Sequence, residues 1–298
     1  MPLRYVVPRT PHRGRFYFFT PLSLALITMF ATIINDCTDD NARGRQESRL
    51  QSLTETPTNF IGVASDIEAS GHLVDVLDAT AGRPGIVLVN VAPRGDHAKK
   101  WENGTPFGYF WFDQTLVVAS VDGLVLAGIK KFGFCEEIHL LDTHTGAAAM
   151  RDANFITPDE AERIPQTQFR SFDFTPRIGA FIFSSGTVPS EPYPLEQVPE
   201  LPLAIWHIDN FGNCKSTLTA TDLQGQSEVE TRYGVLPYVP QLRDVPDGHH
   251  AITAGSSGFR DTRFLEFIVQ RQSFARAHTV KIGDDVFTDQ SYFVTATE

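Results

Sequence analysis

Cysteine is scarce in this 298-residue chain, and the few cysteines present exclude two classes of site. Cys37, Cys135 and Cys214 stand far apart and form no Cys-x-x-Cys or Cys/His pair. Zinc sites built on cysteine need closely spaced thiolates, so the sequence predicts no metal site. We interpret the cysteines as the reduced thiols of a cytosolic protein, in keeping with the rarity of disulfides in that compartment.

Positive charge is also in short supply. Lysine and arginine together number 25 against 36 aspartates and glutamates, which gives a net charge of -11 and a pI near 5.3. Nucleic-acid binding needs a basic surface that neutralises phosphates, and no such cluster follows the first residues of the chain. Nucleic acid is therefore not expected as a partner.

Several catalytic signatures are missing as well. The chain has no GxxxxGK[ST] phosphate loop and no strand-coupled GxGxxG dinucleotide motif. The segment AGSSGF, residues 254–259, lacks the GxSxG spacing of a nucleophile elbow, which argues against a serine hydrolase. His249 and His250 are adjacent, a spacing that favours a solvated turn over a chelating pair.

The N-terminus has the pattern of a leader segment. Four arginines precede the apolar stretch FYFFTPLSLALITMFATII, as in a signal peptide or membrane anchor. Pro21 interrupts the stretch, no small-x-small cleavage site follows, and the apolar run merges with the next strand. We expect the natural start at Met29, residues 1–28 to be an extended leader, and the protein to be cytoplasmic. A genuine membrane anchor is the alternative.

Strand and helix patterns alternate from residue 29 to residue 185. Continuous apolar runs predict buried strands at 29–35 and 86–91, and two further strands are expected around Asp113–Gln114. A helix is expected directly after Asp39 or Asp40, either of which can cap it. Another is expected over 65–81, where Ser65 and Glu68 have capping-box spacing. This alternation predicts an α/β domain with a largely parallel central sheet.

The composition changes after residue 185. Residues 184–202 carry five prolines, and we expect an inter-domain linker over 186–202. Short strand-like runs separated by Gly, Asp and Asn turns follow to the C-terminus. They predict a small all-β barrel domain over 203–298.

Polar residues follow the predicted strands of the first domain. Asp36 and the 92–97 loop come directly after strand ends, where open α/β sheets bind ligands. The cluster DCTDD could hold Mg²⁺ through Asp36 and Asp39, as in a phosphohydrolase. A phosphatase of the haloacid dehalogenase type would need an acid two residues after the first, and that position is Thr38.

A succession of motifs resembles the S-adenosyl-L-methionine (SAM) hydroxide adenosyltransferase family, whose relatives include fluorinase and chlorinase. In order they are IINDCTDDN (33–41), VNVAPRG (89–95), VDGL (121–124), IDNFGN (208–213) and SSGF (256–259). The most specific is IDNFGN, which resembles the Ile-Asp-x-Phe-Gly-Asn motif of the family. The resemblance runs from Met29 to the C-terminus. It implies an α/β domain, a linker, a β-barrel, and a homotrimer with SAM bound between neighbouring subunits.

The resemblance also implies roles in substrate binding for residues from both halves of the chain. Asp36 matches the acid that holds the ribose hydroxyls, and Asp39 with Asp209 would face the methionine ammonium. In the second half, Asn213 and Gln270 fall near adenine, and Ser256 falls at the methionine carboxylate. Phe211 belongs to the same motif as Asp209. From the residues alone, the acids could instead be helix caps and the others turn residues.

The reaction implied by the resemblance is attack of water or hydroxide on the ribose C5′ atom of SAM, with adenosine and L-methionine as products and no further cofactor. The Asp-Arg-His constellation of the hydrolytic relatives is not matched. Ala92 stands at the Asp, Lys99 or Lys100 at the Arg, and Arg170 at the His. We expect Arg170, His97 and Lys99 to form a different catalytic set.

Other functions stay open at this point. The altered catalytic positions favour a SAM- or adenosine-binding protein of the same fold that lacks turnover. A SAM-dependent halogenase is a further alternative, although the aromatic residue that flanks the ribose in fluorinase is replaced by Ala92 as well.

Overall fold

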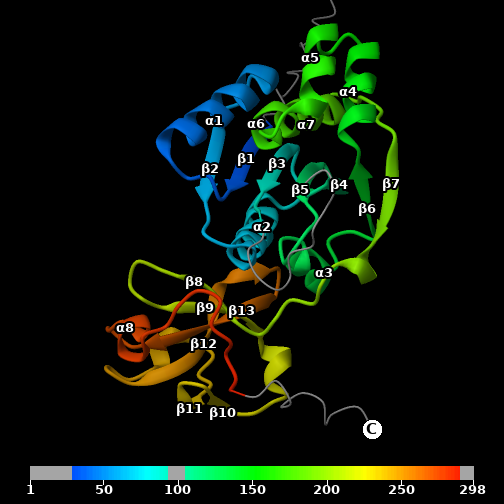
Figure 1. Ribbon diagram of the computed structural model, residues 1–298. Helices are drawn as coiled ribbons and strands as arrows, with labels where there is room; N and C mark the ends of the chain where they lie inside the picture. The colour runs from blue at the N-terminus through cyan, green and yellow to red at the C-terminus, as the bar shows by residue number, and fades with distance from the viewer. Residues whose placement is uncertain (1–28, 93–104, 289–298) are drawn as a thin grey trace, which may run out of the picture.

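The computed structural model describes residues 29–92 and 105–288 and places an α/β unit above an all-β unit (Figure 1). Within those two ranges, no helix has the length and apolar character needed to cross a membrane. Residues 1–28, expected to be a leader, and residues 93–104 lie outside the described residues.

A seven-stranded sheet forms the centre of the first unit. Its order is β2-β1-β3-β5-β4-β6-β7. The β2, β1, β3 and β5 strands are parallel, and β4 and β7 run antiparallel to their neighbours. The strands span Phe30–Asn35 (β1), Thr58–Gly62 (β2), Gly85–Asn90 (β3), Phe107–Phe112 (β4), Thr115–Ser120 (β5), Glu137–Leu141 (β6) and Ser190–Pro194 (β7).

Helices cover both faces of this sheet. On one face, Leu73 and Val74 of α2 pack with Val87 and Val117 of the sheet, and on the other Ile178 of α7 packs with the opposite face of the strands. The helices span Asp40–Thr54 (α1), Asp66–Thr80 (α2), Ala127–Phe132 (α3), Thr143–Asp152 (α4), Pro158–Arg163 (α5), Arg170–Asp173 (α6) and Thr175–Phe183 (α7). The predicted α/β domain is confirmed, with the strands buried on both faces as their continuous apolar runs indicated.

Part of the predicted linker belongs to the sheet. Residues 190–194 form β7, which pairs with β6 at the edge of the sheet and buries Tyr193. Pro192 and Pro194 lack a backbone N–H, and proline within sheets is confined to such edge strands. The prolines are therefore compatible with an edge strand, and residues 190–194 lie in the sheet rather than in the linker expected over 186–202.

The second unit is built from antiparallel strands. A four-stranded sheet has the order β12-β13-β9-β8, and β10 and β11 form a separate hairpin. The elements span Ile205–Ile208 (β8), Cys214–Thr219 (β9), Glu228–Thr231 (β10), Gly234–Pro237 (β11), His250–Phe259 (β12), Thr262–Val269 (β13) and Phe274–His278 (α8). The all-β prediction is confirmed, except that residues 274–278 are helical, and Asp285 makes an isolated bridge to Ala204.

Short 3₁₀ helices connect several of these elements. They span Ile164–Gln166, Leu195–Gln197, Ala220–Leu223 and Leu242–Asp244.

Helix α2 joins the two units. Trp206 of β8 is fully buried against it, and a Cβ atom on Gly71 would lie 2.2 Å from the indole ring, so only glycine permits this approach. Further along α2, the Asp75 carboxylate accepts hydrogen bonds from Ser257 Oγ at 2.8 Å and from the Gly258 backbone N–H at 3.0 Å. Apolar packing and partly buried hydrogen bonds therefore fix the second unit on the first.

Candidate functional site

Asp36 lies at the carboxyl edge of the parallel strands. Its backbone N–H donates to the Asn90 carbonyl, and its Oδ2 atom accepts a hydrogen bond from the Ala92 backbone N–H at 3.1 Å. The neighbouring Asn35 is buried, donates to Gln46 and accepts from the Cys37 N–H, which fixes the turn out of β1. The carboxylate is thus held at the end of two adjacent strands, where ligands of α/β sheets bind.

Asp39 has a structural role in the single chain. It is the N-cap of α1, and its Oδ1 atom accepts from the backbone N–H groups of Asn41 at 3.1 Å and Ala42 at 3.0 Å. The predicted capping function is confirmed. A role for Asp39 at the methionine ammonium stays a prediction.

Arg170 lies at the same edge of the sheet. The antiparallel β4 places its first residue, Phe107, beside Ser120, the last residue of β5. The guanidinium of Arg170 lies over the Phe107 ring, 5.5 Å from its centroid, and burial lowers the pKa of Arg170 below its usual range. Ser120 also bonds the Val91 backbone, one residue before the Ala92 that donates to Asp36. Asp36 and Arg170 therefore belong to one edge of the sheet.

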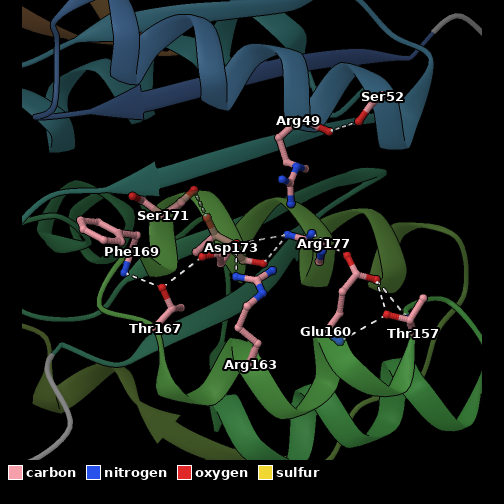
Figure 2. Close-up of polar contacts among 11 residues, drawn as sticks. Arg49, Ser52, Thr157, Glu160, Arg163, Thr167, Phe169, Ser171, Asp173 and Arg177 are labelled. Atoms are coloured by element: carbon pink, nitrogen blue, oxygen red, sulfur yellow. Dashed lines mark hydrogen bonds and ion pairs between the residues drawn. The ribbon is translucent and has the colours of Figure 1, made fainter.

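A network of polar side chains fixes the segment that carries Arg170 (Figure 2). Asp173 accepts from Thr167 Oγ1 at 3.0 Å and forms an ion pair with Arg163 at 2.9 Å. The buried Arg177 donates to the Asp173 backbone carbonyl and to the Glu160 carboxylate, each at 2.8 Å. Because buried charges are stable only when paired, the network defines the conformation of residues 167–177.

This network could hardly be predicted from the sequence. One local signal was Thr157 followed three residues later by Glu160, which the structure shows as a complete capping box at the start of α5. The other was the i,i+4 spacing of Asp173 and Arg177. The remaining partners are brought together by the packing of α5, α6 and α7, which no short sequence pattern indicates.

The IDNFGN motif forms a compact loop between β8 and β9. Oδ1 of Asp209 accepts from the backbone N–H groups of Phe211 and Asn213, both at 2.9 Å, and Oδ2 accepts from Asn213 Nδ2 at 3.0 Å. Gly212 has φ of 85°, and a Cβ atom there would lie 2.0 Å from Ser273 Oγ. The loop conformation therefore explains two of its residues directly, since Asp209 organises the turn and the position of Gly212 requires glycine.

This loop lines a pocket of about 690 Å³ in the all-β unit. Asp209, Phe211, Asn213 and Gln270 all border it, so four predicted binding residues meet in one place. Phe211 is 71% exposed, and the Gln270 side chain donates to the Leu242 carbonyl at 3.1 Å. A largely exposed aromatic ring bordering a pocket offers a surface on which a planar base can stack.

The other predicted residues lie elsewhere or outside the described ranges. Ser256 is exposed on a bulge of β12 and does not border the pocket, whereas the adjacent Ser257 is buried in the contact with α2. Among the described residues, no hydrogen bond or ion pair joins Asp36 to Asp209. His97 and Lys99 lie outside the described residues.

Comparison with known proteins supports the resemblance in the second unit. Residues 203–287 match the family described as the SAM hydroxide adenosyltransferase C-terminal domain. No curated protein matches the chain. The matched range contains the pocket and the IDNFGN loop, and the family description points to a SAM-related activity.

Two solved structures share the fold. An uncharacterized conserved protein from Thermotoga maritima is 16% identical, with a TM-score of 0.58 over 86% of this chain and 98% of that one. A conserved hypothetical protein from Thermus thermophilus is 17% identical, with a TM-score of 0.54 over 85% and 97% of the two chains. The predicted resemblance to the SAM hydroxide adenosyltransferase family is therefore confirmed for residues 203–287. The two solved structures show that the chain shares their fold.

Proposed function

We propose that the protein is an enzyme that cleaves SAM with water or hydroxide at the ribose C5′ atom and releases adenosine and L-methionine. The observation that carries this proposal is the IDNFGN loop, which borders a pocket inside a match to the SAM hydroxide adenosyltransferase C-terminal domain. The reaction needs no cofactor, since the sulfonium leaves as a neutral thioether. The C5′–S electron pair goes to sulfur, a C5′–O bond forms, and one proton is released when water is the nucleophile.

Each binding residue has a chemical task in this proposal. Asp36 accepts hydrogen bonds from the ribose hydroxyls, for which a carboxylate is a strong acceptor. Asp209 supplies negative charge for the methionine ammonium, and Asn213 offers both a donor and an acceptor to adenine. Phe211 and Gln270 border the same pocket and complete the adenine side. Asp39 is proposed beside Asp209 at the methionine ammonium, and Ser256 at the methionine carboxylate.

The two halves of the site come from different copies of the chain in this proposal. Asp36 belongs to the sheet edge of the first unit and Asp209 to the pocket of the second, and no contact between them is found among the described residues of the single chain. A homotrimer that places the pocket of one subunit against the sheet edge of its neighbour would bring them together. Closed cyclic oligomers of this kind form through one repeated heterologous interface.

The protein would act by orienting water in line with the C5′–S bond and by excluding bulk solvent. Arg170, at the same sheet edge as Asp36, is proposed to hold the attacking water or hydroxide together with His97 and Lys99. A second candidate is a SAM-binding protein without turnover. It is favoured by Ala92, whose backbone bonds Asp36 while its side chain replaces the acid of the hydrolytic relatives.

The test is to incubate the purified protein with SAM and to separate the products by chromatography, with and without chloride. We expect adenosine and methionine in equal amounts and no chlorinated nucleoside, because water or hydroxide is the proposed nucleophile. The Arg170→Ala variant is expected to bind SAM but to lose most of its turnover.

Three outcomes would contradict the proposal in different ways. Unchanged SAM with measurable binding would identify the binding protein, and chlorinated adenosine would identify a halogenase. Activity that depends on Mg²⁺ and disappears with a chelator would favour a phosphohydrolase based on Asp36 and Asp39. The His144→Ala variant, an exposed change on α4, is the matched control for the arginine variant.

A further inference from the structure

Three metal-binding side chains meet where α2 contacts β8. Glu68 and His72 lie four residues apart on one face of α2, and His207 comes from β8 of the other unit. Their ligand atoms all lie within 4.8 Å of one another. None of the three borders the pocket of the proposed SAM site.

Neighbouring groups orient these side chains. Oε2 of Glu68 accepts from the Ala64 backbone N–H at 2.8 Å, and Oε1 lies 3.3 Å from Nδ1 of His207. The His72 ring packs edge-on against Trp206 and His207, with centroids 5.3 and 5.2 Å apart. A ligand carboxylate held by a backbone N–H has the kind of outer support that orients metal ligands. The imidazole of His72 is positioned by packing instead.

The spacing suits a tetrahedral ion. Metal–ligand bonds of about 2.0–2.1 Å place neighbouring donor atoms about 3.3 Å apart. The Glu68–His207 pair is already at that separation, and small rotations of His72 would complete the set. Two imidazoles and one carboxylate form a recognised zinc ligand combination with a fourth position for water.

We propose that Glu68, His72 and His207 bind a divalent transition-metal cation of the Zn²⁺ class, which clamps the all-β unit to α2. Because His207 precedes Asp209 by two residues, the ion would also hold the start of the IDNFGN loop. The sequence predicted no metal site, since His207 is 139 positions from Glu68 and the pair on α2 forms no recognised motif.

Side chains of both charges lie near the three proposed ligands, and together they leave room for a bound cation. Lys215 on β9 opposes a second cation. Its ammonium donates to Ser257 Oγ at 2.6 Å and lies 3.9 Å from the Glu266 carboxylate, which partly neutralises its charge.

The test uses the full chain without a histidine tag, stripped with a chelator and then titrated with Zn²⁺ by calorimetry. We expect one ion per chain at micromolar or lower concentration, and Co²⁺ substitution should give the visible absorption of a four-coordinate site. His72→Ala and His207→Ala should each weaken Zn²⁺ binding at least about tenfold. Loss of an outer-shell partner already weakens metal binding by about 10- to 100-fold, and loss of a ligand should cost no less. His144→Ala, an exposed change, should have no effect.

The variants are informative only while folded, so circular dichroism accompanies each titration, and Glu68→Gln provides a near-isosteric third variant. Absence of stoichiometric Zn²⁺ binding to the intact chain would overturn the proposal. Binding that survives both histidine substitutions would do the same. Neither result bears on SAM cleavage, which is measured separately.

Discussion

The Asp36→Asn variant is expected to lose most of its SAM cleavage while keeping its fold. The side-chain oxygen of asparagine can still accept a hydrogen bond from the Ala92 N–H, so the conformation at the end of β1 should be unchanged. Its amide nitrogen donates where a ribose hydroxyl would need an acceptor, and the negative charge is lost. Hydrogen bonds to charged groups contribute about 1.5–3 kcal/mol, which corresponds to a fall in kcat/KM of about 10- to 150-fold.

The measurement is the rate of adenosine formation over a range of SAM concentrations. Asp40→Asn is the matched control, because Asp40 is an exposed acid in the first turn of α1 and has no proposed part in binding. Unaltered kcat/KM in Asp36→Asn, with the control also unaltered, would remove Asp36 from the site.

Two substitutions of Asp209 are expected to separate its charge from its structural role. In Asp209→Asn the side-chain oxygen can still accept from the Phe211 and Asn213 N–H groups, so the loop should persist while the charge for the ammonium disappears. We expect SAM affinity to fall about 10- to 150-fold, as for other lost hydrogen bonds to charge. Asp209→Ala removes all three acceptor contacts and should be worse in both affinity and stability.

Calorimetric titration with SAM measures the affinity, and thermal unfolding measures the stability of each variant. Equal affinity in wild type and Asp209→Asn would show that the charge has no role in binding. Equal unfolding temperatures in wild type and Asp209→Ala would show that the loop does not depend on this carboxylate.

Local patterns predicted those parts of the fold that depend on neighbouring residues. The helix expected over 65–81 spans Asp66–Thr80 with Ser65 as its cap. Glu68, however, accepts from Ala64 rather than Ser65 and contacts His207, so the predicted capping box does not close. The turn at Asp113, with φ of 50°, separates two strands as expected.

Features that depend on distant contacts could not be predicted. The sequence of β7 resembled a linker, because prolines occur both in linkers and in edge strands. Only the pairing of β7 with β6 distinguishes the two structures. The buried ion network around Asp173 and the Glu68–His72–His207 group combine separate elements of the fold. The family resemblance assigned Asp209, Asn213 and Gln270 to the binding of one ligand. The packing of β8, β9 and β13 is what brings these residues to one pocket.

Mixed oligomers of two weakened variants are the most direct test of the shared site. They test whether one SAM molecule is bound between the sheet edge of one subunit, which carries Asp36, and the IDNFGN loop of its neighbour, which carries Asp209. Chains carrying Asp36→Asn and chains carrying Asp209→Asn are co-expressed with different tags, and assemblies containing both are purified and supplied with SAM. Each mixed cyclic trimer has one of its three sites with both acids intact, so about a third of wild-type turnover should return. Mixed assemblies as inactive as either parent would contradict a shared site, because a site confined to one chain keeps a lesion in every copy.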